Sequence, residues 1–242
     1  MHTQVTARPA IANNLLAALP RSEYQRLLSG MEKIELDFGQ VLYDSGDAIK
    51  HVYFPDDSLV SLLTVVDRHL ALEVGMVGRE GMVGVAFALG IDVSPIRAMV
   101  QGAGHALRMK TARFRKELRH SLPLQREVLL YSHTLMAQIA QTAACNRFHV
   151  IEARLARWLL MTRDRVRADQ FRLTHEFLGH MLGVRRVGVT KAAFALRKRD
   201  LIDYTRGNMV ILSSPGLEAA SCSCYEVVRT KPRATRRPRP II

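Results

Sequence analysis

Residues 173–196 read LTHEFLGHMLGVRRVGVTKAAFAL, and two interpretations compete for this stretch. His175-Glu176 followed by His180 resembles the H-E-x-x-H helix of zinc hydrolases, in which both imidazoles lie on one face at i and i+4. Here the second histidine comes at i+5. Because an α-helix turns about 100° per residue, the two side chains point to nearly opposite sides. We therefore expect neither histidine to be a metal ligand.

The same stretch has the pattern of two short helices joined by a tight turn. Gly183 tolerates the positive φ that such a turn needs, and Gly179 lies where the second helix crosses close to the first. Thr174 suits the N-cap of the first helix. The positions that face the shared core are all apolar, namely Leu178, Leu182, Val184, Val189 and Ala192. We predict a helix–turn–helix over 175–194, with the second helix from about Arg185 to Lys198.

The second helix is predicted to present a polar face near its start. Its members are Arg185, Arg186, Val187, Thr190 and Lys191. In helix–turn–helix proteins this end enters the major groove of DNA. Arginine can hold guanine O6 and N7, lysine and threonine can reach bases or phosphates, and valine can touch a thymine methyl group. An ordinary solvated helix face is the alternative, and it stays open chiefly for Arg185 and Thr190.

Further DNA contacts are predicted around this helix. Thr174 and His175 lie at the start of the first helix, where the motif meets the DNA backbone. The run LIDYTRGNMVIL, residues 201–212, predicts a β-hairpin with Arg206 and Asn208 near its tip, and Arg206 suits a phosphate. His180 is expected on solvent or against another helix.

The charge distribution agrees with a polyanionic partner. The chain of 242 residues carries a formal net charge of +13, and residues 145–242 hold 20 Lys+Arg against 8 Asp+Glu. Residues 1–144 hold 15 Lys+Arg against 14 Asp+Glu. Such asymmetry is typical of a nucleic-acid-binding C-terminal part. A solvated basic surface with a basic tail is the other interpretation, because the Pro/Arg-rich run 229–242, expected to be disordered, supplies six of these cations.

Composition bounds the class of protein. Hydrophobic residues make up 48% and charged residues 24%, which is usual for a globular protein with a core. No apolar run approaches the length of a membrane span, and the start of the chain has no secretory h-region. Three cysteines argue against a disulfide framework and for a reducing compartment. We expect a cytoplasmic protein without membrane association.

The sequence pattern changes once along the chain, from one typical of β-strands to one typical of helices. Residues 34–109 consist of short β-rich runs broken by Gly, Pro and Asp, which predicts an antiparallel sandwich or barrel. From Thr111 the pattern is helical, and Pro123 suits the start of a long helix reaching about Phe148. Residues 1–12 look unstructured, and the next stretch is expected to be helical with Asn13 or Asn14 as its N-cap.

The long helix is predicted to mediate dimerisation. Val128, Leu135 and Thr142 lie seven apart, and a weaker second row comes from Tyr131 or Ser132 with Gln138 or Ile139. A seven-residue repeat can form the seam between two helices, although packing on the helix's own domain is the alternative. The candidate dimer interface is Val128, Tyr131, Leu135, Ile139 and Thr142.

On these motifs the chain resembles the Crp/Fnr superfamily of bacterial transcription regulators. The resemblance covers about residues 13–228 and is densest from CNRFHVIEARLARWLL, which begins at Cys145, through the helix–turn–helix and hairpin to GLEAASCSCY. It implies an α+β fold: a double-stranded β-helix (cyclic-nucleotide-binding-like) sensor over 13–120, a dimerisation helix over 121–148, a winged helix–turn–helix over 149–228, and the basic tail 229–242. It also implies a non-enzymatic homodimer that binds an inverted repeat in double-stranded DNA, with RNA polymerase as a partner.

The predicted sensor departs from this pattern. Cyclic-AMP-binding members carry F-G-E-L and a downstream Arg-Ser or Arg-Thr pair, which hold the ribose and the phosphate. Here Gly84 is followed by Val85, Ser94-Pro95 stands near the place of the pair, and Arg97 comes two or three residues late. Losing these charge-assisted bonds predicts no cyclic-AMP response. No cysteine precedes Cys145, so the iron–sulfur cluster of oxygen-sensing relatives is not expected either.

The remaining cysteines give no metal prediction. Cys145 and His149 are spaced i and i+4, but two ligands are weak support for a metal, and a packed thiol beside a capping histidine is the favoured interpretation. Cys222 and Cys224 follow the predicted wing, and packing or exposure is favoured over a redox role. No four Cys and His residues have the sequence spacing of a structural zinc site, so we expect no cofactor and no metal.

Two other functions remain as alternatives. One is a metal-dependent hydrolase that uses His175, Glu176 and His180, which the spacing disfavours. The other is a nucleotide-binding signalling module whose basic half binds RNA or acidic proteins. Preference for single strands over duplex DNA would favour the latter.

Overall fold

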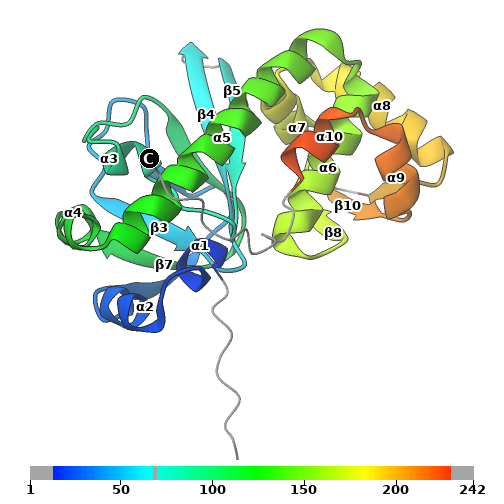
Figure 1. The fold of residues 1–242 in the computed structure, drawn as a ribbon. Helices are drawn as coiled ribbons and strands as arrows, with labels where there is room; N and C mark the ends of the chain where they lie inside the picture. Colours follow the sequence, from blue (N-terminus) through cyan, green and yellow to red (C-terminus); the bar gives the residue numbers. More distant parts are fainter. Residues whose placement is uncertain (1–12, 68–69, 206, 230–242) are drawn as a thin grey trace, which may run out of the picture.

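The computed structural model describes residues 13–67, 70–205 and 207–229, and the chain forms two lobes spanned by one long helix (Figure 1). The N-terminal lobe contains two antiparallel sheets, and the C-terminal lobe is mostly helical with a small sheet of its own. Thus the predicted α+β class, with a β domain, a long helix and a C-terminal helix–turn–helix, is confirmed. The predicted disordered ends, 1–12 and most of 229–242, lie outside the described residues.

Two short helices precede the β domain, α1 (Asn14–Ala17) and α2 (Arg21–Leu28). Asn13 is the N-cap, and its side-chain oxygen accepts hydrogen bonds from the backbone N–H groups of Leu15 and Leu16. Its side-chain amide also donates to the carbonyls of Pro55 and Gly81, both at 2.9 Å. One buried side chain therefore caps α1 and fastens it to the β domain.

The two N-terminal sheets enclose the first core. One sheet has the order β1 (Glu32–Leu36), β7 (Gly104–Lys110), β3 (His51–Pro55). The other has the order β2 (Val41–Tyr43), β6 (Arg97–Gly102), β4 (Leu59–Asp67), β5 (Leu70–Val77), with the short helix α3 (Val85–Ala88) after β5. All pairs are antiparallel. Inward-facing side chains from both sheets, such as Val52, Phe54 and Val100, are buried together.

Two helices follow the sheets, α4 (Thr111–His120) and α5 (Leu122–Phe148). Ser121 caps α5 by accepting a hydrogen bond from the Leu124 N–H, and Pro123 stands in the first turn where its missing N–H costs nothing. Figure 1 shows α5 running diagonally from the β domain to the C-terminal lobe.

One face of α5 packs on the β domain, and this corrects the predicted dimer seam. Val128, Tyr131, Leu135 and Thr142 are buried within the chain, and Ile139 packs against the first core. The Tyr131 ring lies over Gly81, and the Leu135 and Ile139 side chains lie over Gly75 of β5. Gln138 fixes the register, because its amide exchanges two hydrogen bonds with the Met76 backbone. The row faces the chain's own core, so it is not available to a second copy.

The C-terminal lobe begins with α6 (Ile151–Val166). The elements after it are β8 (Gln170–Arg172), α7 (His175–Leu182), α8 (Arg186–Lys198), β9 (Ile202–Thr205), β10 (Asn208–Ile211), α9 (Ser214–Ala220) and α10 (Cys224–Val228). The three strands form a sheet in the order β8-β10-β9, so the predicted hairpin is present and gains a third strand that the sequence pattern did not indicate.

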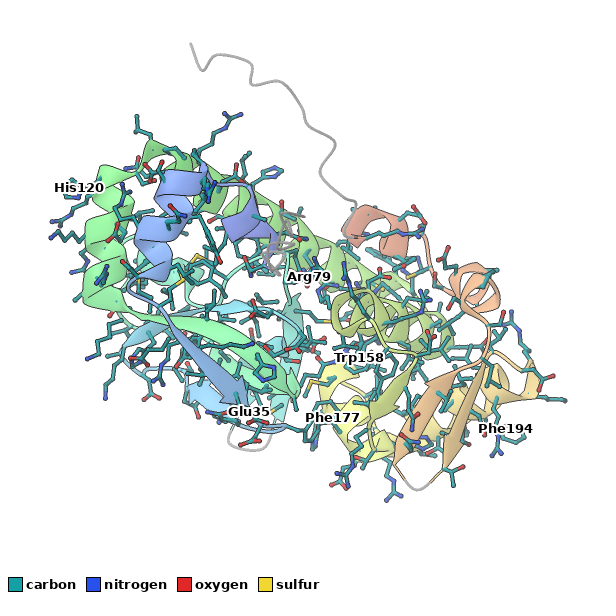
Figure 2. The ribbon with its side chains drawn as sticks, turned by 90° about the horizontal axis from the view of Figure 1, so that it is seen from below. Glu35, Arg79, His120, Trp158, Phe177 and Phe194 are labelled. Atoms are coloured by element: carbon teal, nitrogen blue, oxygen red, sulfur yellow. The ribbon has the colours of Figure 1, made fainter. Side chains whose placement is uncertain are left out.

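The two lobes share a continuous packed junction. Leu59, Leu63 and Met76 of the β domain belong to the same core as Leu155 and Trp158 of α6. Trp158 and Phe177 lie where the lobes meet, whereas Phe194 lies at the far end of the C-terminal lobe (Figure 2). Polar groups are buried here too: the Trp158 indole N–H donates to the Glu73 carboxyl at 2.8 Å, and Arg165 pairs with Glu80 at 2.7 Å.

Candidate nucleic-acid interface

Helices α7 and α8 form the predicted helix–turn–helix. Thr174 caps α7 through a hydrogen bond that its hydroxyl accepts from the Phe177 N–H, and Gly183 ends α7 with φ +62°. A Cβ on Gly179 would stand 3.0 Å from the Val184 carbonyl oxygen. Both glycines therefore do what the sequence predicted: one makes the left-handed turn, and the other lets the turn backbone approach α7. The predicted core positions Leu178, Leu182, Val189 and Ala192 are buried and Val184 is half-buried.

The first turns of α8 present the predicted cluster to solvent. Arg185 is the N-cap, and Arg186, Val187, Thr190 and Lys191 are all exposed. Among the described residues no carboxylate forms an ion pair with Arg185, Arg186 or Lys191. These three cations are thus exposed without an internal counterion at one end of one helix.

The other end of α8 is different. Arg197 pairs with Asp203 at 2.9 Å and stacks over the Tyr204 ring, and Arg199 pairs with Glu152 at 3.0 Å. These arginines tie α8 to β9 and α6, so they are engaged within the protein. The C-terminal end of α8 is thus held by contacts within the protein, whereas the cations at its N-terminal end are available to a ligand.

His175 is held against α8. Its Nδ1 lies 3.1 Å from the Thr190 hydroxyl, which itself donates to the Arg186 carbonyl, so the ring N–H must donate to Thr190. The ring also meets Tyr204 edge-on at a centroid distance of 4.8 Å. Burial, together with the nearby Arg186 charge, lowers the pKa of His175 below its usual range. A neutral, hydrogen-bonded ring orients the helix but offers no charge to a phosphate.

The hairpin β9–β10 lies beside this helix as a wing. Asn208 pairs across the hairpin with Thr205 and across the sheet with Arg172 of β8. Arg206, the predicted phosphate contact at the tip, lies outside the described residues. Exposed Arg172 was not among the predicted contacts. Only the β8–β10 pairing brings it to the hairpin, and the short QFR run carries no clear strand signal.

The histidine pair is not assembled as a metal site. In the part of the chain that the structure describes, His175, Glu176 and His180 belong to no group of three potential ligands with converging atoms. His180 is exposed near the end of α7, while His175 turns toward α8. This agrees with the helical-spacing argument and leaves the hydrolase alternative without a supporting contact.

Comparison with known proteins agrees with this geometry. The family described as the Crp-like helix-turn-helix domain matches residues 153–220. No curated protein sequence matches the chain.

Three solved regulators have a similar fold. FixK2 from Bradyrhizobium japonicum is 12% identical, with 80% of this chain and 98% of that chain covered and a TM-score of 0.68. CLP, the c-di-GMP-responsive regulator of Xanthomonas campestris, is 15% identical, with coverage of 80% and 100% and a TM-score of 0.66. A CRP-family regulator of Thermus thermophilus is 17% identical, with coverage of 79% and 96% and a TM-score of 0.66. At such identities the likeness establishes the fold.

Proposed function

We propose that this chain is a transcription regulator of the Crp/Fnr superfamily that recognises a specific inverted repeat in double-stranded DNA as a homodimer. Its Crp-like helix-turn-helix domain over residues 153–220 and its fold support the proposal. The observation that carries the proposal is the cluster of exposed cations without internal ion pairs at the start of α8.

Helix α8 enters the major groove with this end first. Arg186 and Lys191 lie on its exposed face, so Arg186 reads a guanine edge and Lys191 reaches a base or phosphate. Arg185, Thr190 and Val187 complete the contact, and Thr174 with Arg172 meets the backbone. His175 acts through Thr190, which it holds in place, rather than by contacting DNA itself.

The second copy packs on the outer face of α5. Leu129, Leu130 and Met136 are 61%, 44% and 61% exposed on this face. With Arg126, His133, Ala137, Ala140 and Ala144, all exposed, they repeat at intervals of three and four residues. Large apolar side chains at one end and alanines at the other form a stripe that a parallel partner helix can cover. Two α8 helices would then lie about one DNA turn apart, roughly 34 Å.

The β domain acts as the sensor over residues 13–120, and its ligand is not cyclic AMP. Val85, at the start of α3, offers no carboxylate for a ribose. Arg97 is bound by Asp44 at 2.7 Å, so its charge is already satisfied within the protein. A signal in this domain shifts the population between arrangements of the two α8 helices. The dimerisation helix, α5 within 121–148, transmits the signal from the sensor. The winged helix over 149–228 then changes its position relative to DNA.

The protein works in the cytoplasm, where RNA polymerase is its partner at promoters. No helix in the described ranges is long and apolar enough to cross a membrane. None of the three cysteines forms a disulfide, as expected of a reducing compartment.

The decisive experiment is selection of bound duplexes from a randomised pool by the full-length protein. We expect a palindromic site whose half-sites are centred about one helical turn apart. Arg186→Ala should weaken binding to that site by ~1–3 kcal/mol and relax the preference at one base pair of each half-site.

Arg199→Ala is the matched control. It removes an arginine from the other end of α8 that is paired with Glu152, so base preference should stay unchanged. A selection that returns no consensus, an Arg186→Ala variant with wild-type preference, or tighter binding to single strands would contradict the proposal.

A further inference from the structure

The chain's three cysteines converge on one histidine in a buried cluster that the function above does not use. Cys145 and His149 lie at the end of α5, and Cys222 and Cys224 flank the turn between α9 and α10. The four potential ligand atoms, three sulfurs and one imidazole nitrogen, all lie within 4.8 Å of one another. All three cysteines are buried and His149 is half-buried.

The separations match those of a single tetrahedral ion. Zn–S bonds of about 2.3 Å and Zn–N bonds of about 2.0–2.1 Å place neighbouring ligands at about 3.8 Å (S to S) and about 3.5 Å (S to N) in a tetrahedron. Here Cys145 Sγ lies 3.5 Å from Cys222 Sγ, and Cys224 Sγ lies 3.4 Å from His149 Nδ1. Since no separation exceeds 4.8 Å, side-chain shifts of about 1 Å bring all four atoms to one ion.

Two arginines of α6 are buried near the cluster. Arg154 is buried without an ion pair to any carboxylate of the described residues, and its Nε has no hydrogen-bond partner. Burial lowers the pKa of Arg154, and negative charge on Cys145 and Cys222 would act against that effect. Arg157, also buried, interacts with Cys145. Three thiolates, one neutral imidazole and one divalent ion carry a net charge of −1, which would balance a buried cation that otherwise lacks a counterion.

A hydrogen bond to one of the sulfurs supports the same assignment. The Gln141 amide donates to Cys224 Sγ at 2.9 Å, the kind of N–H···S contact that orients a metal-bound sulfur.

We propose that Cys145, His149, Cys222 and Cys224 bind one zinc ion that fastens the end of α5 to the segment after the wing. Sulfur and imidazole ligands in a closed tetrahedral set are the donors of structural zinc sites. On binding, the thiols release their protons to solvent and no other bond changes. The ion would connect α5 and α10, two elements that are already in contact. In Figure 1, α10 lies in the C-terminal lobe, into which the C-terminal part of α5 extends.

Metal content of the full-length protein, purified under reducing conditions without chelators, tests the assignment. Mass spectrometry should find one zinc per chain. Cys145→Ser, Cys222→Ser and His149→Ala should each reduce this to a small fraction, whereas His120→Ala, an exposed histidine at the end of α4, should retain it.

A second measurement uses the wild-type chain alone, in case the variants fail to fold. After zinc is removed, titration with Co²⁺ should give the intense visible absorption of a tetrahedral cobalt–thiolate site, saturating at one ion per chain. Zinc should displace this signal and raise the melting temperature. A folded chain that takes up neither ion, an iron–sulfur chromophore, or a Cys145–Cys222 disulfide under the same reducing conditions would overturn the proposal.

Discussion

At the scale of single residues, the helix–turn–helix depends on two glycines that are needed for different reasons. Gly183 adopts φ +62°, where a side chain is strained. Gly179 has ordinary helical geometry, and the constraint there is the Val184 carbonyl oxygen, 3.0 Å from the position of a Cβ. Backbone cannot move aside as a flexible side chain can, so even one methyl group at residue 179 must push the turn away from α7.

Gly179→Ala should therefore lower the free energy of unfolding by roughly 1–3 kcal/mol, despite the better helix propensity of alanine. Gly188→Ala is the matched control, because a Cβ there meets only the Cδ1 atom of the Ile151 side chain, also at 3.0 Å. That side chain can rotate, so the control should be close to neutral. Urea denaturation of both variants checks this. Equal losses of stability would show that the close approach is not what Gly179 provides.

At the scale of elements, α5 has apolar side chains on two opposite faces with similar spacing. The row through Val128 and Leu135 packs on the β domain, and the row through Leu129 and Met136 is exposed. A helix that is apolar all round is buried on both sides in its working state. Since the inner face is already covered by the chain itself, the outer face is the one left for a second copy.

Met136→Lys should convert the proposed dimer to a monomer, because it places a charge at the centre of the proposed stripe. Leu89→Lys is the matched control, since Leu89 is similarly exposed, at 56%, but lies after α3. Light scattering on eluting protein gives the mass of each variant. A wild-type monomer at micromolar concentration, or a Met136→Lys dimer, would rule out this face as the interface.

At the scale of the whole molecule, a buried polar network joins the lobes. The Ser61 hydroxyl lies 2.5 Å from a Glu73 oxygen and 2.6 Å from the Gln101 side-chain oxygen, and Gln101 continues to Thr162 of α6. One hydroxyl proton cannot serve two acceptors. The network is satisfied when Glu73 is protonated, so that it donates to Ser61 and Ser61 donates to Gln101. Burial raises the pKa of Glu73 to about 7, in agreement with this arrangement.

The stability of the junction should therefore depend on pH. A carboxyl whose pKa is higher in the folded chain than in the unfolded chain binds its proton more tightly when folded, so its contribution is present at about pH 4.5 and is lost as the pH rises to about 7. Glu73→Gln, which keeps one acceptor and one donor, should remove this loss. Glu35→Gln, at an exposed carboxyl of β1, should not.

Trp158 is the chain's one tryptophan and touches Glu73, so its fluorescence reports on this contact directly. Urea midpoints between about pH 5 and about pH 8 should fall for the wild type and stay level for Glu73→Gln, relative to the control. Parallel curves for wild type and Glu73→Gln would show that Glu73 does not set the pH dependence.

The sequence by itself determined the features that rest on local chemistry. The helix–turn–helix is specified by Gly179, Gly183 and the apolar positions between Leu178 and Ala192. A turn conformation and a helical period both depend on residues that are close in sequence, so a sequence pattern can reveal them. The same holds for an asparagine cap at residue 13 or 14, for Pro123 at the start of α5, for the exposed face of α8 and for the change from β-rich to helical pattern.

Only the tertiary structure decided what depends on which surfaces meet. The two faces of α5 have the same spacing, so the packing of Tyr131 on Gly81 was needed to show which one is internal. Arg154 and Arg157 look like solvated charges in sequence but are buried. Cys145 and Cys222 stand 77 positions apart, beyond any spacing motif, and the fold alone places their sulfurs 3.5 Å from each other. Periodicity describes one element at a time, whereas burial and ligand sets are properties of several elements packed together.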